Sequence, residues 1–262
     1  MPVTPTDEAR RLEQFWNSRY LEFSLRESGI KTLTPAYSEL LYRCKKAAYM
    51  KALAMGAIST KQAISILDGG CGQGFFAAVA QEIFSSPKYT GIDISEKAIS
   101  FLKTKFPQFR WVCADLCDKG LKLPPMFNIV QSIEVLHLVL DDINHSQALC
   151  NLACSVAPGG ILVTTDTLPQ QHHHANEYIV FRPGQYYWNL LADLKMKVLG
   201  VFPMYYWIPD MGLASHRLSG CFRRIPPAWV YYSDRLFLKL RIPQFRQTHD
   251  SRMKMIVCQK AS

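Results

Sequence analysis

A glycine-rich turn between an apolar run and a helical pattern is the segment of this sequence best suited to chemistry. Residues 66–74 read I-L-D-G-G-C-G-Q-G, and residues 75–80 continue with helical character. Such a turn must bend sharply and lie against a ligand beside a helix N-terminus, which requires residues without a Cβ. We assign Gly70, Gly72 and Gly74 to that contact, although a glycine pattern alone is weak evidence for a nucleotide site.

Two acids follow the next two apolar runs and strengthen this interpretation. Asp93 ends the run 89–92 about 20 residues after the last glycine, which is the spacing of an acid that binds ribose hydroxyls. Asp115 follows the run 111–113. We expect Asp68, Asp93 and Asp115 to point into one crevice at the carboxyl edge of a sheet. The alternative is that Asp93 and Asp115 only cap helices.

Short apolar runs alternate with helix-length segments and predict the strands that position these residues. The runs are 63–67, 89–92, 111–113, 129–132, 161–165, 198–202 and 253–259. Strands separated by helices imply right-handed crossovers and a parallel sheet covered on both faces. The expected fold is therefore α/β, with a Rossmann-like, mostly parallel seven-stranded sheet and helices on both faces.

The flanking segments add a lid and an insertion to a single expected domain. We expect an N-terminal helical lid over 1–62, a core over 63–207, an aromatic and basic insertion over 208–252 and a last strand over 253–262. The lid should hold a short helix near 12–23 and a longer one between Pro35 and Gly56, with Lys45 largely off its apolar face. The insertion exceeds an ordinary connection. It is interpreted as a packed cap, a homodimer surface or a peripheral membrane contact.

Composition sets the class of protein and its expected compartment. The chain has 262 residues, of which 48% are hydrophobic and 19% charged, as in globular proteins. Eight cysteines without an export signal indicate reduced thiols and a cytoplasmic location, and we expect no membrane-spanning helix. The net charge of +9 favours anionic partners or is only a solvated surface.

The sequence resembles the class I S-adenosylmethionine-dependent methyltransferases over residues 63–166. The D-x-G-x-G-x-G form beginning at Asp68 is similar to their first motif and differs from the G-x-G-x-x-G/A of nicotinamide enzymes, which disfavours an oxidoreductase. The resemblance extends through Asp93, Asp115, the strand 127–132 and the P-G-G turn at 158–160.

This resemblance implies a methyltransferase that uses S-adenosylmethionine and releases S-adenosylhomocysteine. The expected donor-binding residues surround the methionine part, the ribose and adenine, the adenine amine and the sulfonium. Around the methionine part we expect Asp68, Gly70, Cys71, Gly72 and Gly74, and around the ribose and adenine Asp93 and Ile94. Asp115 and Leu116 should lie at the adenine amine, and Ser132 and Ile133 under the sulfonium. The lid adds Tyr20 to this set. Two departures from the family pattern are Gly69, expected to loosen the turn, and Asn128, where Asp is frequent.

A general base is optional in methyl transfer, because alignment of the acceptor with an activated methyl group supplies much of the rate. If the acceptor is a hydroxyl, the base candidates are His137, which is the first choice, Asp166, and a loop run of three histidines at 172–174. His137 is equally interpretable as a packing residue. No metal is expected, since adjacent imidazoles diverge and the cysteine pairs 113/117 and 150/154 are interpreted as packing thiols.

The segment after the fourth strand bears on the acceptor. Residues 132–135 read S-I-E-V, where methyltransferases of base amino groups carry an N-P-P-[YF]-like segment. A small-molecule acceptor is favoured, anionic or aromatic, with a hydroxyl of a specialised metabolite or sugar first and carbon or nitrogen close behind. No DNA partner is expected. An RNA or protein methyltransferase that uses the basic surface is the alternative, and a non-catalytic scaffold is the least supported.

Aromatic residues could roof the acceptor pocket or belong to the core: Tyr178, Phe181, Tyr186, Tyr187, Trp188, Tyr205, Tyr206 and Trp207.

Overall fold

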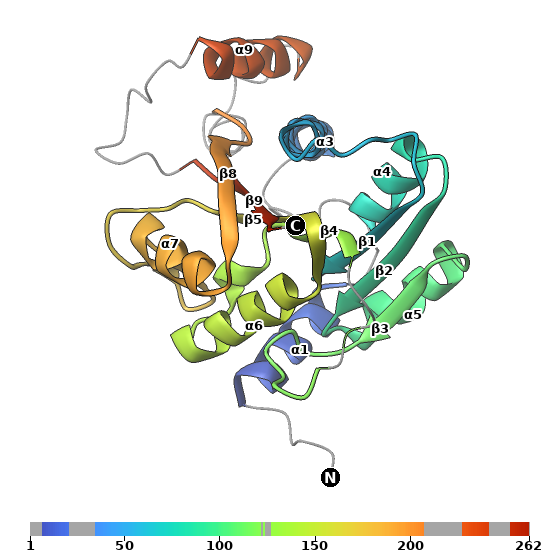
Figure 1. The fold of residues 1–262 in the computed structure, drawn as a ribbon, viewed down its shortest axis with the longest axis vertical. Coiled ribbons are helices and arrows are strands. Elements are labelled where there is room, and N and C mark those ends of the chain that lie inside the picture. The colour runs from blue at the N-terminus through green and yellow to red at the C-terminus, as the bar shows by residue number, and fades with distance from the viewer. Residues whose placement is uncertain are drawn as a thin grey trace.

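A central sheet with helices on both sides forms the body of the computed structural model, which describes residues 7–20, 35–121, 123, 127–206, 227–240 and 252–261 (Figure 1). The helices are α1 (Asp7–Arg19), α3 (Pro35–Met55), α4 (Phe75–Ile83), α5 (Glu96–Lys105), the 3₁₀ turn η1 (Leu136–Leu138), α6 (Asp142–Cys154), α7 (Gly184–Asp193) and α9 (Pro227–Lys239). The strands are β1 (Ile64–Gly69), β2 (Pro87–Asp93), β3 (Arg110–Cys113), β4 (Phe127–Ser132), β5 (Val156–Asp166), β6 (His173–Asn176), β7 (Ile179–Phe181), β8 (Met196–Pro203) and β9 (Lys254–Lys260).

The main sheet confirms the predicted seven-stranded, mostly parallel arrangement. Its strand order is β3-β2-β1-β4-β5-β9-β8, and β9 runs antiparallel to both of its neighbours. The chain builds outward from β1 to β3 and then returns to place β4 on the other side of β1. A crevice at the carboxyl ends of strands next to such a reversal is where open α/β sheets bind ligands.

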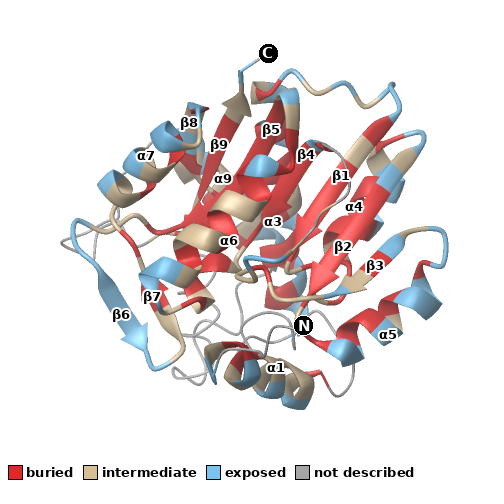
Figure 2. Cartoon of the chain, turned by 60° about the horizontal axis from the view of Figure 1, so that its bottom comes forward, coloured by how far each residue is buried: buried red, intermediate tan, exposed pale blue. Residues whose placement is uncertain are grey.

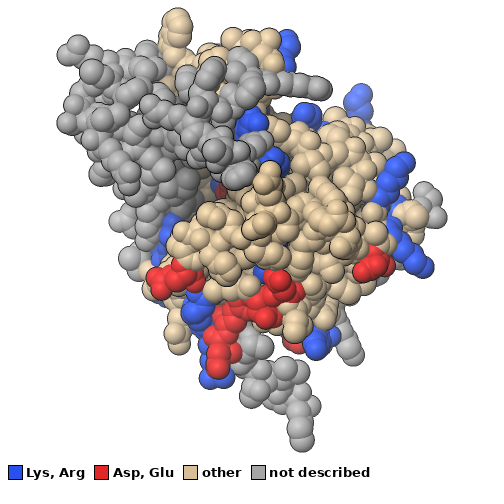
Figure 3. All heavy atoms as spheres, turned by 90° about the vertical axis from the view of Figure 1, so that its left-hand side faces the viewer, with Lys and Arg blue, Asp and Glu red and all other residues tan. Residues whose placement is uncertain are grey.

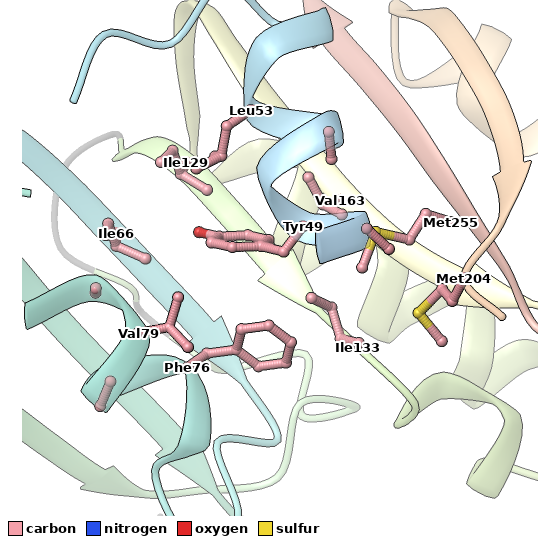
Figure 4. Close-up of a cluster of buried hydrophobic side chains, with 14 of the residues drawn as sticks. Tyr49, Leu53, Ile66, Phe76, Val79, Ile129, Ile133, Val163, Met204 and Met255 are labelled. Carbon is pink, nitrogen blue, oxygen red and sulfur yellow. The ribbon is translucent and has the colours of Figure 1, made fainter. Parts of the chain in front are cut away.

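Alternating side chains supply the two faces that the helices cover. Ile66 and Ile129 belong to one buried cluster with residues of α3, α4 and α5, whereas Leu67 and Val130 belong to the other, with residues of α6 and α7. Successive side chains of a strand point to opposite faces, so strands buried on both sides need near-continuous apolar runs. The inner strands β1, β4 and β5 are accordingly buried along most of their length, whereas the edge strands β3 and β8 are more exposed (Figure 2). Figure 4 shows Tyr49 of α3 packed over the first of these faces.

The predicted flanking helices form with shifted bounds. α1 begins at Asp7 rather than near residue 12, with Asp7 and Glu8 in its first turn and Arg19 in its last, as the helix dipole favours. α3 begins at Pro35 as predicted. Within the insertion, α9 packs against α3, where the Arg43 guanidinium lies 4.5 Å from the centre of the Tyr231 ring. Trp207 and residues 208–226 and 241–251 of the insertion lie outside the described residues.

Two local expectations about the sheet are wrong. Gly69 does not loosen the turn: it pairs with Ile92 as the last residue of β1, and a Cβ there would lie 2.9 Å from Leu152 Cδ2. The histidine run does not form a loop, because His173 begins β6, which pairs antiparallel with β7. The other departure, Asn128, has a structural use, since its Oδ1 accepts the Ser65 N–H at 2.9 Å across β1 and β4.

Two surface properties of the described residues bear on partners: the hydropathy of the helices and the distribution of charge. No helix in the described part of the chain is both long and apolar enough to span a bilayer. Figure 3 shows acidic side chains gathered low on one face, with basic side chains around them. Over the described residues of that face, the positive charge therefore does not form one continuous patch.

Candidate active site

A pocket lies at the carboxyl edge of the sheet, where the segments after β1, β2, β3 and β4 meet α1 and α3. Its lining includes the glycine turn, the ends of β2 and β4, the segment after β3 and one face of α1. The sequence predicted this location from the glycines and acids. The helices that close the pocket come from residues distant in the chain.

The glycine turn adopts backbone conformations that favour residues without a Cβ. Gly70, Gly72 and Gly74 have φ of 80°, 53° and 77°. The Gly70 and Cys71 N–H groups donate to Ile92 O at 2.7 and 2.9 Å, which ties the turn to the end of β2. Gly70, Cys71 and Gly72 line the pocket. Gly74 does not: a Cβ at Gly74 would lie 2.5 Å from Leu102 Cδ2, so this glycine permits close packing of α4 on α5 instead.

Asp93 is buried in the pocket wall and is held by the backbone of the turn. Its Oδ2 accepts the Gly72 N–H at 2.8 Å, and its Oδ1 accepts the Ser95 N–H at 2.9 Å. Burial raises the pKa of Asp93, while these N–H donors act to lower it. The helix-cap alternative is wrong for Asp93, because the Ser95 side chain caps α5. Ile94 lies beside Asp93 in the pocket lining.

Asp115 and Leu116 line the same end of the pocket, after β3. Asp115 Oδ1 accepts the Cys117 N–H at 2.9 Å, within a turn rather than at the start of a helix. A carboxylate beside an apolar wall can accept a hydrogen bond from an exocyclic amine while the wall packs against its ring.

Asp68 lies beneath the pocket rather than in it. Its carboxylate accepts the Tyr89 hydroxyl, and Asp68 is not among the lining residues. Burial raises the pKa of Asp68 to about 6, against the lowering effect of the hydrogen bond from the Tyr89 hydroxyl. The expectation that all three acids point into one crevice is therefore wrong for Asp68. Its buried side chain instead contacts Tyr89 of the neighbouring strand β2.

After β4 the structure separates Ser132 from Ile133. Ser132 is fully buried and outside the pocket lining, whereas Ile133 lines the pocket. Within the described residues the Ser132 hydroxyl has no hydrogen-bond partner.

Neither residue chosen as the first or second base candidate lines the pocket. His137 is buried, with its ring 5.5 Å from that of Phe181, and burial lowers its pKa to about 4. Asp166 is fully buried and accepts hydrogen bonds from the Thr167 N–H at 2.6 Å and the Tyr187 hydroxyl at 2.9 Å. His137 therefore packs beside β7, and Asp166 is held by its own backbone neighbour and by Tyr187 of α7. The exposed His172 contacts Asp142 at 3.3 Å and is likewise outside the lining.

Helix α1 covers the pocket and is fastened at both ends. Trp16 and Tyr20 line the pocket, with ring centres 5.3 Å apart, and Tyr20 is buried. Near the start of the helix, Glu8 Oε1 accepts the Leu140 N–H at 2.6 Å. Near its end, Asn17 Oδ1 accepts the Ser95 hydroxyl at 2.7 Å. Figure 2 shows α1 lying across this edge of the sheet.

Sequence reasoning missed two polar groups of the pocket, Lys45 and Glu134, and did not single out Gln73 within the range 70–74 expected around the methionine part. Gln73 is buried, and within the described residues its Nε2 has no hydrogen-bond partner. Lys45, expected off the apolar face of α3, is 3% exposed and forms an ion pair with Glu134. The available signal was an acid immediately after the fourth strand. Nothing local indicated that a lysine of α3 would meet it.

The pocket therefore combines groups suited to a polar, partly cationic ligand. Carboxylates at Asp93 and Asp115 accept hydrogen bonds, an unsatisfied amide at Gln73 donates one, and apolar walls come from Ile94 and Leu116. These features fit the hydroxyls, the base and the amino-acid end of an adenosyl amino acid.

Comparisons with known proteins agree with this geometry. Residues 66–160 match the family model described as "Methyltransferase domain". No curated protein sequence matches the chain. Magnesium protoporphyrin IX methyltransferase from Synechocystis PCC 6803, solved with bound SAM, is 11% identical with a TM-score of 0.61, and the match covers 99% of this chain and 100% of that one.

Two further solved structures are similar in fold. A SAM-dependent methyltransferase from Leishmania major is 9% identical with a TM-score of 0.62, over 96% of this chain and 82% of that one. The N-methyltransferase NodS from Bradyrhizobium japonicum WM9, in complex with S-adenosyl-L-homocysteine, is 14% identical with a TM-score of 0.54, over 84% and 88%. The family match covers residues 66–160, which include the glycine turn and Asp93, and the three solved structures share the fold of this chain.

Proposed function

We propose that this chain is a class I S-adenosylmethionine-dependent methyltransferase that moves the methyl group of the donor to a small-molecule acceptor, with a hydroxyl oxygen favoured over nitrogen and carbon. The observation that carries the donor assignment is the buried Asp93 carboxylate, held at 2.8 Å by the Gly72 N–H inside the pocket. Both carboxylate oxygens keep lone pairs that can accept the two ribose hydroxyls.

The other donor contacts follow from the pocket lining. Ile94 and Leu116 would pack against the adenine ring, and Asp115 would accept its amine. Gly70 and Gly72 would lie along the methionine part, whose carboxylate suits the free Gln73 Nε2. When bound, the donor supplies a methyl group already activated by a sulfonium.

The protein's contribution is binding, alignment and exclusion of water. The α1 side chains Leu12, Trp16 and Tyr20 cover the pocket, and the contacts of Glu8 and Asn17 hold that helix in place. A roof of this kind favours an acceptor that enters whole over a segment of a macromolecule. It also lowers the local dielectric constant, which strengthens the polar contacts within the site.

Transfer of radiolabelled methyl from S-adenosylmethionine to a fractionated metabolite extract tests this proposal. We expect the label in a small-molecule fraction with the unmodified protein and not with Asp93→Ala. Label in RNA or protein fractions would favour the alternative acceptor class, and no label in any fraction together with no donor binding would contradict the proposal.

A further inference from the structure

An ion pair forms part of the pocket wall. Lys45 of α3 and Glu134, two residues after β4, both line the pocket, and their side chains are 4% and 21% exposed. A buried pair of this kind is weak evidence for stability, because desolvation of both charges opposes their attraction. Its place in a pocket suggests a functional use.

Glu134 adopts an unfavourable backbone conformation at this position. Its φ is 59°, a left-handed backbone conformation that is unfavourable for a non-glycine residue. The Glu134 N–H donates to Thr165 Oγ1 at 2.7 Å, and the Tyr205 hydroxyl lies 3.4 Å from Glu134 Oε1. These contacts fix both the backbone and the carboxylate.

Lys45 is held as an ammonium beside this carboxylate. Burial acts to lower the pKa of Lys45, but the nearby Glu134 and Tyr42 raise it by more. The net shift of this pKa is therefore upward. The Lys45 Nζ lies 4.2 Å from the centre of the Tyr42 ring. Lys45 therefore orients the Glu134 carboxylate through their ion pair.

Strand order separates this pair from the adenosyl end of the pocket. Asp93 and Asp115 follow β2 and β3 on one side of β1, whereas Glu134 follows β4 on the other side. A donor whose ribose lies on Asp93 and whose amino-acid part lies along the glycine turn directs its sulfonium toward β4. Among the acids that line the pocket, Glu134 is the one on that side.

We infer that Glu134 marks the acceptor end of the pocket and receives the proton of a protic acceptor, a hydroxyl or an amine, with Lys45 as its positioning residue. This inference rests on the proposed function. As the acceptor oxygen or nitrogen forms its bond to the methyl carbon, the carbon–sulfur bond breaks and its electron pair stays on sulfur. The acceptor's proton passes to the Glu134 carboxylate.

A comparison of two donor-site ligands tests this inference before an acceptor is known. Sinefungin carries an amine on the carbon that replaces the methyl-bearing sulfur, whereas S-adenosylhomocysteine has no group there. An ammonium at that position would face Glu134. We expect Glu134→Gln to reduce the preference for sinefungin over S-adenosylhomocysteine, measured as the ratio of their Kd values, by at least about tenfold, as expected for a lost charged hydrogen bond.

A matched ion pair on the surface provides the control. Lys46, next to Lys45, pairs with Glu82 at 2.5 Å outside the pocket. Glu82→Gln and Lys46→Met should leave the Kd ratio unchanged. Should Glu134→Gln leave Lys45 unpaired and prevent folding, the double variant K45M/E134Q replaces the pair by neutral groups and should lose the same preference.

The outcomes are distinct. An unchanged Kd ratio in Glu134→Gln, or in K45M/E134Q, with S-adenosylhomocysteine binding intact would overturn the inference and leave the proposed function standing. Failure of the unmodified protein to bind S-adenosylhomocysteine would overturn both.

Discussion

The Gly72 N–H donates to Asp93 Oδ2 at 2.8 Å and joins the turn after β1 to the acid that ends β2. The bond sets the direction of the carboxylate before any ligand arrives, which reduces the cost of ordering it on binding. Two features that the sequence placed about 20 residues apart therefore act as one structural unit.

Asp93→Ala is expected to weaken S-adenosylhomocysteine binding at least about 100-fold, because two hydrogen bonds to a charged group are lost. Isothermal titration calorimetry measures the change. Asp193→Asn, which removes an exposed acid of α7, should bind as the unmodified protein does. Equal affinity in the Asp93 and Asp193 variants would remove Asp93 from the donor site.

Gly72→Ala and Gly74→Ala should separate binding from stability. Both glycines have positive φ, so both substitutions strain the backbone. A Cβ at Gly74 would meet the buried Leu102, whereas one at Gly72 would meet the Tyr20 hydroxyl at 3.2 Å. We expect Gly74→Ala to lower the free energy of unfolding by about 1–3 kcal/mol more than Gly72→Ala, since it overpacks the core. Urea denaturation measures this difference.

Donor affinity should follow the opposite order. Gly72→Ala is expected to weaken S-adenosylhomocysteine binding more than Gly74→Ala does at a temperature where both variants are folded, because only Gly72 lines the pocket. If the two variants lose affinity equally, the assignment of these glycines to different tasks is incorrect.

Loosening α1 should speed release of the bound product. Glu8→Ala removes the acceptor of the Leu140 and Asn144 donors, while most of the helix surface over the pocket is unchanged. A stopped-flow displacement experiment should give a dissociation rate for S-adenosylhomocysteine about fivefold or more above that of the unmodified protein. Gln14→Ala, at an exposed position of the same helix, is the control. A Glu8→Ala rate equal to the control rate would mean that α1 does not gate the pocket.

His137 should make stability fall in mild acid. Burial lowers its pKa to about 4, below the ordinary value near 6.5, so the unfolded chain binds its proton first as the pH decreases. The stability associated with the neutral ring is complete above pH 6.5 and is lost as the pH falls toward 4. At pH 5 this loss amounts to about 2 kcal/mol relative to neutral pH.

His137→Gln removes this contribution. Urea denaturation at pH 7.5 and pH 5 should show a smaller decrease in stability for His137→Gln than for the unmodified protein, by about that amount. If the two proteins lost stability in parallel, the ring would titrate normally and would remain eligible as a base.

The sequence predicted the sheet and one end of the site because both depend on local patterns. Apolar runs give strands, and the spacing from Gly74 to Asp93 follows from one strand–helix–strand unit. The side on which Asp68 points was not predictable from spacing, because tertiary packing against Tyr89 decides it.

The other end of the pocket depends on contacts between distant segments. Lys45 meets Glu134 only after α3 has packed across the sheet, and Glu8 meets Leu140 only after α1 has closed over it. His137 was chosen for its chemistry and its place after the fourth strand. In the structure its ring lies 5.5 Å from that of Phe181, and His137 is not among the residues that line the pocket.

The central claim is that the pocket beside Asp93 holds an adenosyl methyl donor, and titration of the unmodified protein with S-adenosylhomocysteine, in parallel with NADH, tests it most directly. We predict saturable binding of S-adenosylhomocysteine at one site per chain and none of NADH. Binding of NADH alone, or of neither compound, would contradict the account.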